Sequence, residues 1–245
     1  MTLLINTFLL LFAVVLGGLI VVFLEKKNQR SLIKLSLAFS GGFLLAIAFT
    51  HFIPELYHEN NTSIGIWVLV GFLVQLFLEY FSGGIEHGHV HHHDGHKVPI
   101  GLLISLSIHS FIEGIPLASI ESAHQHQHHH LIGDHNDSLL LGIVLHQLPV
   151  AIALMTLLRM SLKKKSHTWL ILLGFALMTP GGMFLGYFLE IKSTFEYMDI
   201  ILAIVVGMFL HISTTIIFET NENHRFNLAK LSAILLGVGV SFFLM

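Results

Sequence analysis

The chain has 245 residues, of which 54% are hydrophobic and only 11% are charged. Soluble domains carry about 25% charged residues, so this composition excludes an ordinary soluble enzyme and a disordered chain. The sequence holds 19 His and no Cys, which excludes disulfides and thiolate metal sites. With a net charge of −3 the sequence shows no basic patch for nucleic acid, so we expect no nucleic-acid partner. We also expect no organic cofactor.

The apolar residues gather into long segments. A membrane-spanning helix needs about 20 mostly apolar residues, and eight segments qualify. We therefore expect an all-α integral membrane protein with one transmembrane domain over residues 1–245 and the lipid bilayer as its main partner. The first segment has no basic leader or signal cleavage site, so we expect it to be retained. The expected spans are 3–24, 35–57, 64–82, 98–119, 138–158, 168–189, 198–218 and 229–245.

The basic residues predict the orientation of these spans. Successive loops between the expected spans lie on opposite sides of the membrane. Eleven of the 12 Lys and Arg fall in the loops of one side, and only Lys192 falls in a loop of the other side. The positive-inside rule places the basic connections in the cytoplasm, which predicts that both termini lie outside. The eleven are Lys26, Lys27, Arg30, Lys34, Lys97, Arg159, Lys163, Lys164, Lys165, Arg225 and Lys230.

Two connections are rich in histidine, one over 83–97 on the predicted cytoplasmic side and one over 120–137 on the predicted external side. Such tracts bind divalent transition metals loosely, so they are candidate auxiliary metal sites for capture or sensing. The alternative is a solvated polar linker. The histidines concerned are His87, His89, His91, His92, His93 and His96 in the first tract, and His124, His126, His128, His129, His130 and His135 in the second.

Ionisable side chains within the spans are costly and indicate function. His51 and Glu55 in span two are four residues apart, as are His109 and Glu113 in span four, so each pair shares a helix face. His146 in span five is a third buried histidine. Imidazole and carboxylate together suit Zn²⁺ and related divalent ions, and we expect these five residues to bind metal.

Proline accompanies each of these candidates. Pro54 precedes Glu55, Pro116 follows Glu113, and Pro149 follows His146, while span six carries Pro180. Proline kinks a helix, and transporters use such breaks to direct ligands at ions.

Three further polar residues lie within the spans. Gln147 is a neutral oxygen donor that we expect to complete the metal shell. Glu79 lies near the predicted cytoplasmic end of span three, where a carboxylate can reach the interface. His211 is either a core histidine bonded to Ser213 or Thr215, or an auxiliary ligand.

Four segments resemble motifs of the ZIP (Zrt/Irt-like protein) family of divalent metal transporters. They are H-S-F-I-E-G at 109–114, H-F-I-P-E at 51–55, L-M-T-P-G-G-M-F-L-G at 177–186 and G-M-F-L-H-I-S at 207–213. The resemblance covers nearly the whole chain and includes the span number, the orientation and the cytoplasmic histidine tract.

The resemblance implies a ZIP-like bundle that moves Zn²⁺, Fe²⁺ or Mn²⁺ toward the cytoplasm, with the plasma membrane as the expected location. It implies a principal metal site that uses His109, Glu113, His146 and His51. It also implies elevator-like alternating access, in which spans one, four, five and six move against the rest, and a homodimer as a frequent assembly.

The chain departs from the family pattern in span five. Many members have H-E-x-P-H-E there, whereas this chain has Gln147, Val150 and Ala151 at positions that carry ligands or acids. Thr179 stands where some bacterial members have Glu. We therefore expect one good metal position instead of a binuclear site.

Three other functions stay open from the sequence. A membrane metalloenzyme with histidine boxes would cluster its histidines at the membrane ends, whereas here the spaced candidates lie within the spans, so we expect no enzyme. An efflux carrier would use similar ligands, and a non-transporting metal sensor would suit a reduced span-five site.

Overall fold

The computed structural model describes residues 2–23, 26–58, 63–82, 100–118, 135–162, 164–192, 196–218 and 228–244. Within these ranges every regular element is helical, which confirms the all-α class. The α-helices are α1 (Thr2–Phe23), α2 (Lys26–Ile47), α3 (Ile53–His58), α4 (Ile64–Ser82), α5 (Ile100–Gly114), α6 (His135–Ser161), α7 (Lys165–Ala176), α8 (Met178–Lys192), α9 (Glu196–Phe218) and α10 (Leu228–Leu244).

The helices are long and apolar enough for a membrane protein. In the described part of the chain, seven helical segments meet the requirements for a span, with α7 and α8 counted together. Helix α10 is apolar but has only 17 residues. Large apolar side chains point outward, among them Phe243 and Phe77, as expected for contact with lipid. The eighth span and the orientation of the termini stay predictions.

Four prolines within the helical segments have four different effects on the helices. The turn before Pro54 widens into a π-helix, η1 (Ala48–Phe52), because proline gives no N–H and its ring crowds the carbonyl four residues earlier. After Gly114 the chain continues as a 3₁₀ turn, η3 (Ile115–Ala118), which contains Pro116. Pro149 is accommodated within α6. The sixth expected span breaks at Leu177, shortly before Pro180, and this separates α7 from α8.

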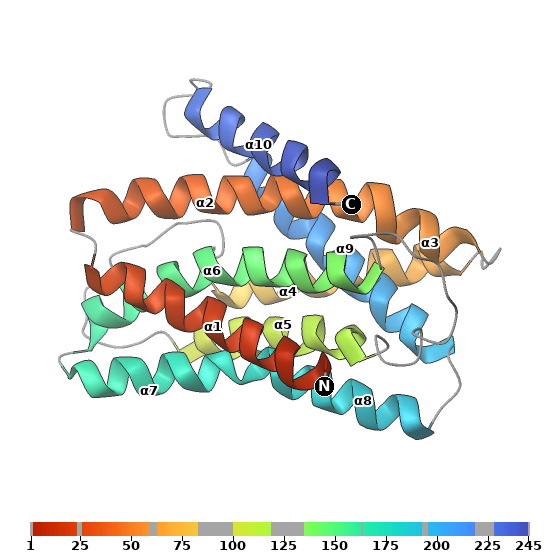
Figure 1. Cartoon of the computed structure of the whole chain (residues 1–245), viewed down its shortest axis with the longest axis horizontal. Helices are drawn as coiled ribbons and strands as arrows, with labels where there is room; N and C mark the ends of the chain where they lie inside the picture. Colours follow the sequence, from red (N-terminus) through yellow and green to blue (C-terminus); the bar gives the residue numbers. More distant parts are fainter. Residues whose placement is uncertain are drawn as a thin grey trace.

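The helices lie side by side along the long axis of the molecule, with α10 crossing α2 at one edge and α7 and α8 at the opposite edge (Figure 1). We divide them into a first helix group, α1, α5, α6, α7 and α8, and a second helix group, α2, α4, α9 and α10. Packing within the first group joins α1 to α6 and α5 to α8, and packing within the second joins α2 to α10 and α4 to α9. The two groups meet mainly where α2 packs on α6 and α4 packs on α5.

Glycines make the closest helix contacts, and these contacts fall within each group. A Cβ added to Gly182 would overlap the carbonyl oxygen of Phe111, which joins α8 to α5. A Cβ added to Gly207 would overlap the carbonyl oxygen of Val68, and this close contact joins α9 to α4. With η3 counted in the first group, every described glycine whose added Cβ would come within 3.0 Å of another helix's backbone joins two helices of the same group. Across the group boundary, a Cβ added to Gly101 of α5 would lie 3.2 Å from the carbonyl oxygen of Phe81 on α4. Small residues allow such close approach in membrane proteins.

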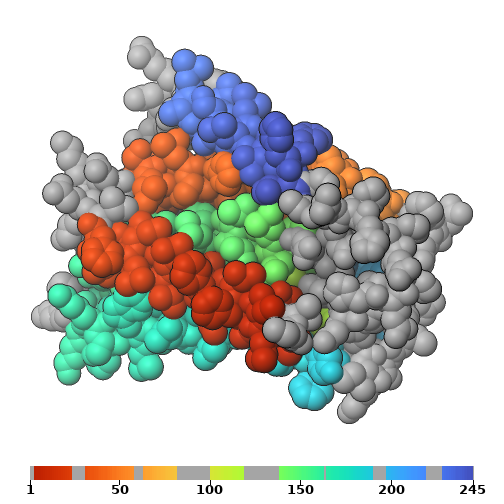
Figure 2. All heavy atoms as spheres, viewed as in Figure 1, coloured from red at the N-terminus to blue at the C-terminus, as the bar shows by residue number. Residues whose placement is uncertain are grey.

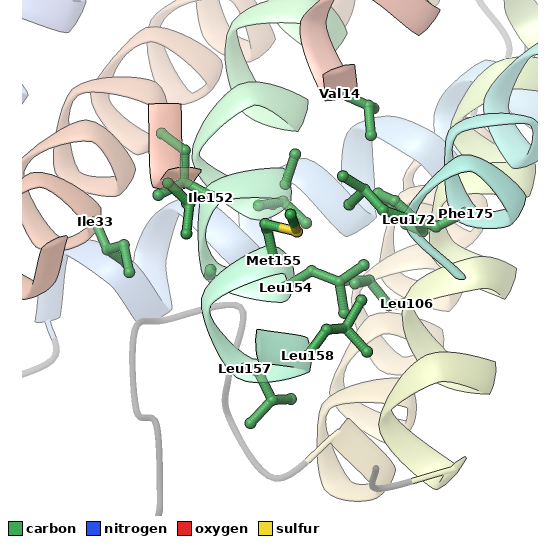
Figure 3. Close-up of a cluster of buried hydrophobic side chains, with 14 of the residues drawn as sticks. Val14, Ile33, Leu106, Ile152, Leu154, Met155, Leu157, Leu158, Leu172 and Phe175 are labelled. Carbon is green, nitrogen blue, oxygen red and sulfur yellow. The ribbon is translucent and has the colours of Figure 1, made fainter. Parts of the chain in front are cut away.

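The buried apolar side chains form two clusters. One cluster surrounds the second half of α6 and contains Leu154, Met155 and Leu158 with Leu172 and Phe175 of α7 (Figure 3). The other surrounds the first half of α6. Helix α6 is the most buried of the candidate spans, and in the space-filling view it shows as a strip between α1 and α2 (Figure 2). The second cluster includes Leu10, Phe43, Ile47, Leu139, Ile143, Val206 and Phe209.

Candidate metal site

A layer of polar side chains separates the two apolar clusters. Along α5 and η3 the chain passes from Leu106 in one cluster, through His109 and Glu113, to Leu117 in the other. Along α6 it passes from one cluster to the other through His146 and Gln147. His109, Glu113, His146, Gln147 and Thr179 are all buried. Polar groups in such surroundings need mutual hydrogen bonds or an ion, so this layer is the candidate site.

His109 and Glu113 face each other, as their spacing on α5 predicts. The distance between His109 Nε2 and Glu113 Oε2 is 3.2 Å. Two ligands of a tetrahedral Zn²⁺ ion, each about 2.0 Å from the metal, would be separated by about 3.3 Å. The two atoms therefore stand at the separation that a shared metal ion requires.

The other carboxylate oxygen of Glu113 is held by donors from α6 and α8. Gln147 Nε2 donates to Glu113 Oε1 at 3.3 Å, and Thr179 Oγ1 donates to the same oxygen at 3.4 Å. Gln147 Nε2 also contacts Thr179 Oγ1 directly. The break at Leu177 places Thr179 at the start of α8, where Gly114 lets its backbone approach α5. These donors stabilise the buried carboxylate and fix its direction.

His146 comes to the same layer from α6. Its ring lies edge-on to the ring of His109, with 5.9 Å between the ring centroids. Gln147 Oε1 is buried and has no hydrogen-bond donor among the described residues, so it is available as a neutral oxygen ligand. The structure thus places four predicted ligands in one polar layer, His109, Glu113, His146 and Gln147, of which His109 and Glu113 stand at the separation that two ligands of one ion require.

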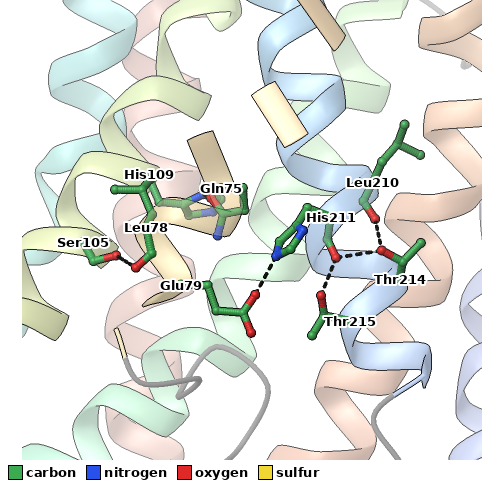
Figure 4. Close-up of polar contacts among 9 residues, drawn as sticks. All are labelled: Gln75, Leu78, Glu79, Ser105, His109, Leu210, His211, Thr214 and Thr215. Atoms are coloured by element: carbon green, nitrogen blue, oxygen red, sulfur yellow. Dashed lines mark hydrogen bonds and ion pairs between the residues drawn. The ribbon is translucent and has the colours of Figure 1, made fainter. Parts of the chain in front are cut away.

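His109 also contacts a residue that the sequence did not single out. Its Nδ1 atom lies 2.9 Å from Oε1 of Gln75 on α4 (Figure 4). An amide oxygen only accepts hydrogen bonds, so Nδ1 carries the proton and donates it. The remaining nitrogen, Nε2, of the neutral ring then presents a lone pair toward Glu113. The sequence signal for Gln75 was a lone amide in an apolar span, one helical turn before Glu79.

This arrangement has a chemical consequence. The Nε2 lone pair of His109 and the carboxylate oxygen of Glu113 are both acceptors, and they face each other at 3.2 Å. Two acceptors at this distance attract only through a cation between them, either a proton or a metal ion. The pair is therefore suited to bind a cation.

The predicted span-two ligands occupy a less enclosed position. His51 lies in the π-helical turn η1 and is half-buried, and Glu55 in α3 is exposed. His51 Nδ1 lies 3.0 Å from Thr50 Oγ1.

Within the described ranges, no three His, Cys, Asp or Glu side chains are placed together to hold a metal ion. The two-ligand centre on α5 is therefore the assembled part of the site, and His51 and Glu55 stay predicted ligands.

His211 has a partner other than those expected. Its Nε2 atom lies 2.5 Å from Glu79 Oε2 and its ring packs edge-on against Phe72 (Figure 4). The hydroxyl of Thr215 donates to the backbone carbonyl of His211 and not to its ring. Glu79 therefore links α4 to α9, in place of simply extending toward the membrane interface.

The histidine tracts lie almost entirely outside the described residues. This holds for all of the first tract, 83–97, and for residues 120–134 of the second.

Apolar helices with a buried polar layer that suits a cation define a class of integral membrane proteins that handle metal ions. The family model described as "ZIP Zinc transporter" matches residues 2–101 and 86–245. Because the match covers almost all of the chain, the protein belongs to the ZIP zinc transporter family. Family membership favours a transporter over the metalloenzyme considered above.

A curated relative supports this assignment. The chain is similar to the zinc transporter SLC39A7 of Rattus norvegicus, with 33% identity over 85 residues. The alignment covers 27% of this chain and 18% of the relative, so the chain spans less than a fifth of that protein.

Proposed function

We propose that the protein transports a divalent metal cation, Zn²⁺ first among the candidates and Fe²⁺ or Mn²⁺ next, across a membrane toward the cytoplasm. The observation that carries the proposal is the pair of facing acceptors on α5, His109 Nε2 and Glu113 Oε2, 3.2 Å apart and buried. Family membership supports metal transport, and the zinc transporter named above supports Zn²⁺ as the substrate.

The chemistry of the layer suits transport better than permanent binding. A Zn²⁺ ion would be bound first by His109 and Glu113, and His146 and the neutral Gln147 of the same layer would move toward the ion to complete four donors. Such a set carries one negative charge, because the imidazoles are neutral when they bind metal. Structural zinc sites are closed and bind very tightly. A site with a single carboxylate and a neutral amide is weaker, so the ion is released more easily.

The helix packing supports alternating access by movement of one helix group against the other. The candidate ligands on α5 and α6 belong to the first helix group, so they would move together. The tight glycine contacts join helices within a group. Where α6 meets α2 across the group boundary, Gly142 contacts only side chains, chiefly that of Ile47. Contact through side chains favours shear at this boundary, whereas at the α4–α5 boundary Ser105 donates to the backbone carbonyl of Leu78, a hydrogen bond that the movement would have to break.

The outer ligands have supporting roles in this proposal. His51 and Glu55 receive the ion from the external side and pass it to His109 and Glu113. The external tract 120–137 raises the local metal concentration, and the cytoplasmic tract 83–97 accepts the released ion or senses its level. The proposed membrane is the plasma membrane, with both termini outside.

Uptake of ⁶⁵Zn into proteoliposomes tests the proposal. We expect wild-type protein to accumulate zinc. His109→Ala and His146→Ala should each reduce uptake by more than about 10-fold, the lower end of what losing a supporting partner costs at a metal site. The matched control is His167→Ala, because His167 is an exposed histidine of α7 away from the polar layer. It should leave uptake unchanged.

The results separate the candidate functions. Unchanged uptake in both site variants would overturn the proposed site. Saturable zinc binding by wild-type protein without any uptake would favour the metal sensor. Competition by Fe²⁺ or Mn²⁺ against ⁶⁵Zn in the same vesicles ranks the three cations.

A further inference from the structure

Gln75 is a buried polar residue outside the ligand set. It is fully buried near the middle of α4, a mostly apolar helix on which Glu79 also makes a polar contact, with His211 of α9. Its Oε1 atom accepts the Nδ1–H of His109 at 2.9 Å. Burying an amide within a membrane costs free energy unless the amide makes hydrogen bonds. Gln75 makes one of these with a candidate metal ligand.

The contact decides which nitrogen of His109 carries the proton. A neutral imidazole has one protonated and one unprotonated nitrogen, and the hydrogen bond made by one nitrogen sets the state of the other. With Nδ1–H bonded to Gln75, the unprotonated nitrogen is Nε2. Nε2 is the atom that faces Glu113 Oε2, so the lone pair points to where the ion would be bound.

Without this acceptor, His109 would have a better alternative. Its ring would place the proton on Nε2 and donate it to Glu113 Oε2, which already lies 3.2 Å away. This internal hydrogen bond would occupy both ligands, and a metal ion would have to displace it. The hydrogen bond between His109 and Glu113 would therefore compete with metal binding.

We propose that Gln75 is a positioning residue for the metal site, which holds His109 in the tautomer whose Nε2 carries the lone pair that binds the ion. The inference rests on the proposed function and adds a residue from α4, in the second helix group, to a site carried by the first. Gln75 acts through His109 and does not itself contact the ion. The tautomer of His109, and with it the metal affinity of the site, therefore depends on the packing of α5 against α4.

A neighbouring bond provides the matched control. Ser105 lies one turn before His109 on α5, and its hydroxyl donates to the backbone carbonyl of Leu78 on α4 at 2.5 Å (Figure 4). It joins the same two helices without touching a candidate ligand. Ser105→Ala therefore weakens the helix contact and leaves the tautomer of His109 alone.

The tautomer can be read directly by ¹⁵N NMR of histidine-labelled, metal-free protein at mildly alkaline pH. The His109 signals are identified by their loss in His109→Gln. In wild-type protein we expect a protonated Nδ1 and an unprotonated Nε2, and in Gln75→Met we expect the reverse, because Met keeps the chain length but removes the amide oxygen. An Nε2-protonated ring in wild-type protein would overturn the inference, whether or not the protein transports metal.

Zinc uptake supplies the second readout. Gln75→Met should raise the KM for zinc about 10- to 100-fold, the range seen when such supporting partners are removed, with the maximal rate within about threefold. Gln75→Glu keeps an acceptor oxygen and should hold the KM near the wild-type value, as should Ser105→Ala. An unchanged KM in Gln75→Met, or an equal rise in Ser105→Ala, would contradict the positioning role. Absence of uptake in wild-type protein would instead count against the proposed function.

Discussion

At the scale of single residues, the site is set by which atoms face each other. The spacing of His109 and Glu113 predicted one shared helix face, and the structure places their side chains in contact. Sequence reasoning did not find the partnership of Gln75 with His109. A contact between residues 34 positions apart depends on how α4 packs against α5, and helix periodicity carries no information on that packing.

Gln147 sets the charge of the site. Its Nε2 atom lies 3.3 Å from Glu113 Oε1, so Gln147→Glu would place a second carboxylate beside the first. Two carboxylates attract a divalent ion more strongly but repel each other when it leaves. We expect the KM for zinc to fall about 10-fold, roughly 1.4 kcal/mol, and the maximal uptake rate to fall as well because release is slower.

The comparison variant at this position is Gln147→Leu, which removes both the donor and the acceptor and should raise the KM. Kinetics of ⁶⁵Zn uptake over a range of free zinc concentrations measure both effects. If Gln147→Glu and Gln147→Leu change the KM in the same direction, the charge of this side chain does not set the affinity.

At the scale of elements, proline and glycine place the ligands. The sequence predicted kinks beside the candidate residues, and the structure shows a π-helical turn before Pro54 and a break before Pro180. The form of each interruption was not predictable, since Pro149 is accommodated inside α6 without one. Whether a proline breaks a helix depends on the neighbours that satisfy the freed carbonyl groups.

Close packing of α8 on α5 keeps Thr179 beside Glu113. Gly182→Ala would force a Cβ into the carbonyl oxygen of Phe111 and push the helices apart. We expect the variant to be destabilised by about 1–3 kcal/mol, as is usual for overpacking. Thermal unfolding in detergent measures this. Gly174→Ala is the control, because an added Cβ there meets nothing within 4 Å, and its unfolding midpoint should match that of wild-type protein.

A Gly182→Ala variant as stable as Gly174→Ala would mean that α5 and α8 tolerate separation. The hydrogen bond from Thr179 to Glu113 would then not depend on the glycine contact.

At the scale of the whole molecule, composition and the lengths of the apolar segments predicted the all-helical membrane class, and the family model and the helices agree with it. The family resemblance predicts that spans one, four, five and six move against the rest. The closest glycine contacts fall within the corresponding helix groups, and the movement itself stays a prediction. The homodimer stays a prediction of that resemblance.

Movement between the groups can be tested by cross-linking, because the chain has no native cysteine. Leu78→Cys with Ser105→Cys places two thiols at the contact between α4 and α5, where Ser105 reaches the backbone of Leu78. The controls are the two single variants, Leu78→Cys and Ser105→Cys, which cannot form this bridge. We expect oxidation to stop uptake only in the double variant, with recovery on reduction. Full uptake with the two cysteines cross-linked would exclude a sliding motion at α4 and α5.

The central claim is that the metal site lies within the spans and not in the histidine tracts. Replacing all twelve tract histidines by serine in the full-length protein, and measuring by elemental analysis the zinc bound at equilibrium with a fixed concentration of free zinc, tests it directly. We predict that about one zinc per chain is bound, as expected for a single metal position, and that adding His109→Ala and His146→Ala to the same protein removes it. Loss of zinc binding on replacing the tracts alone would contradict the claim, because it would place the binding site in the connections.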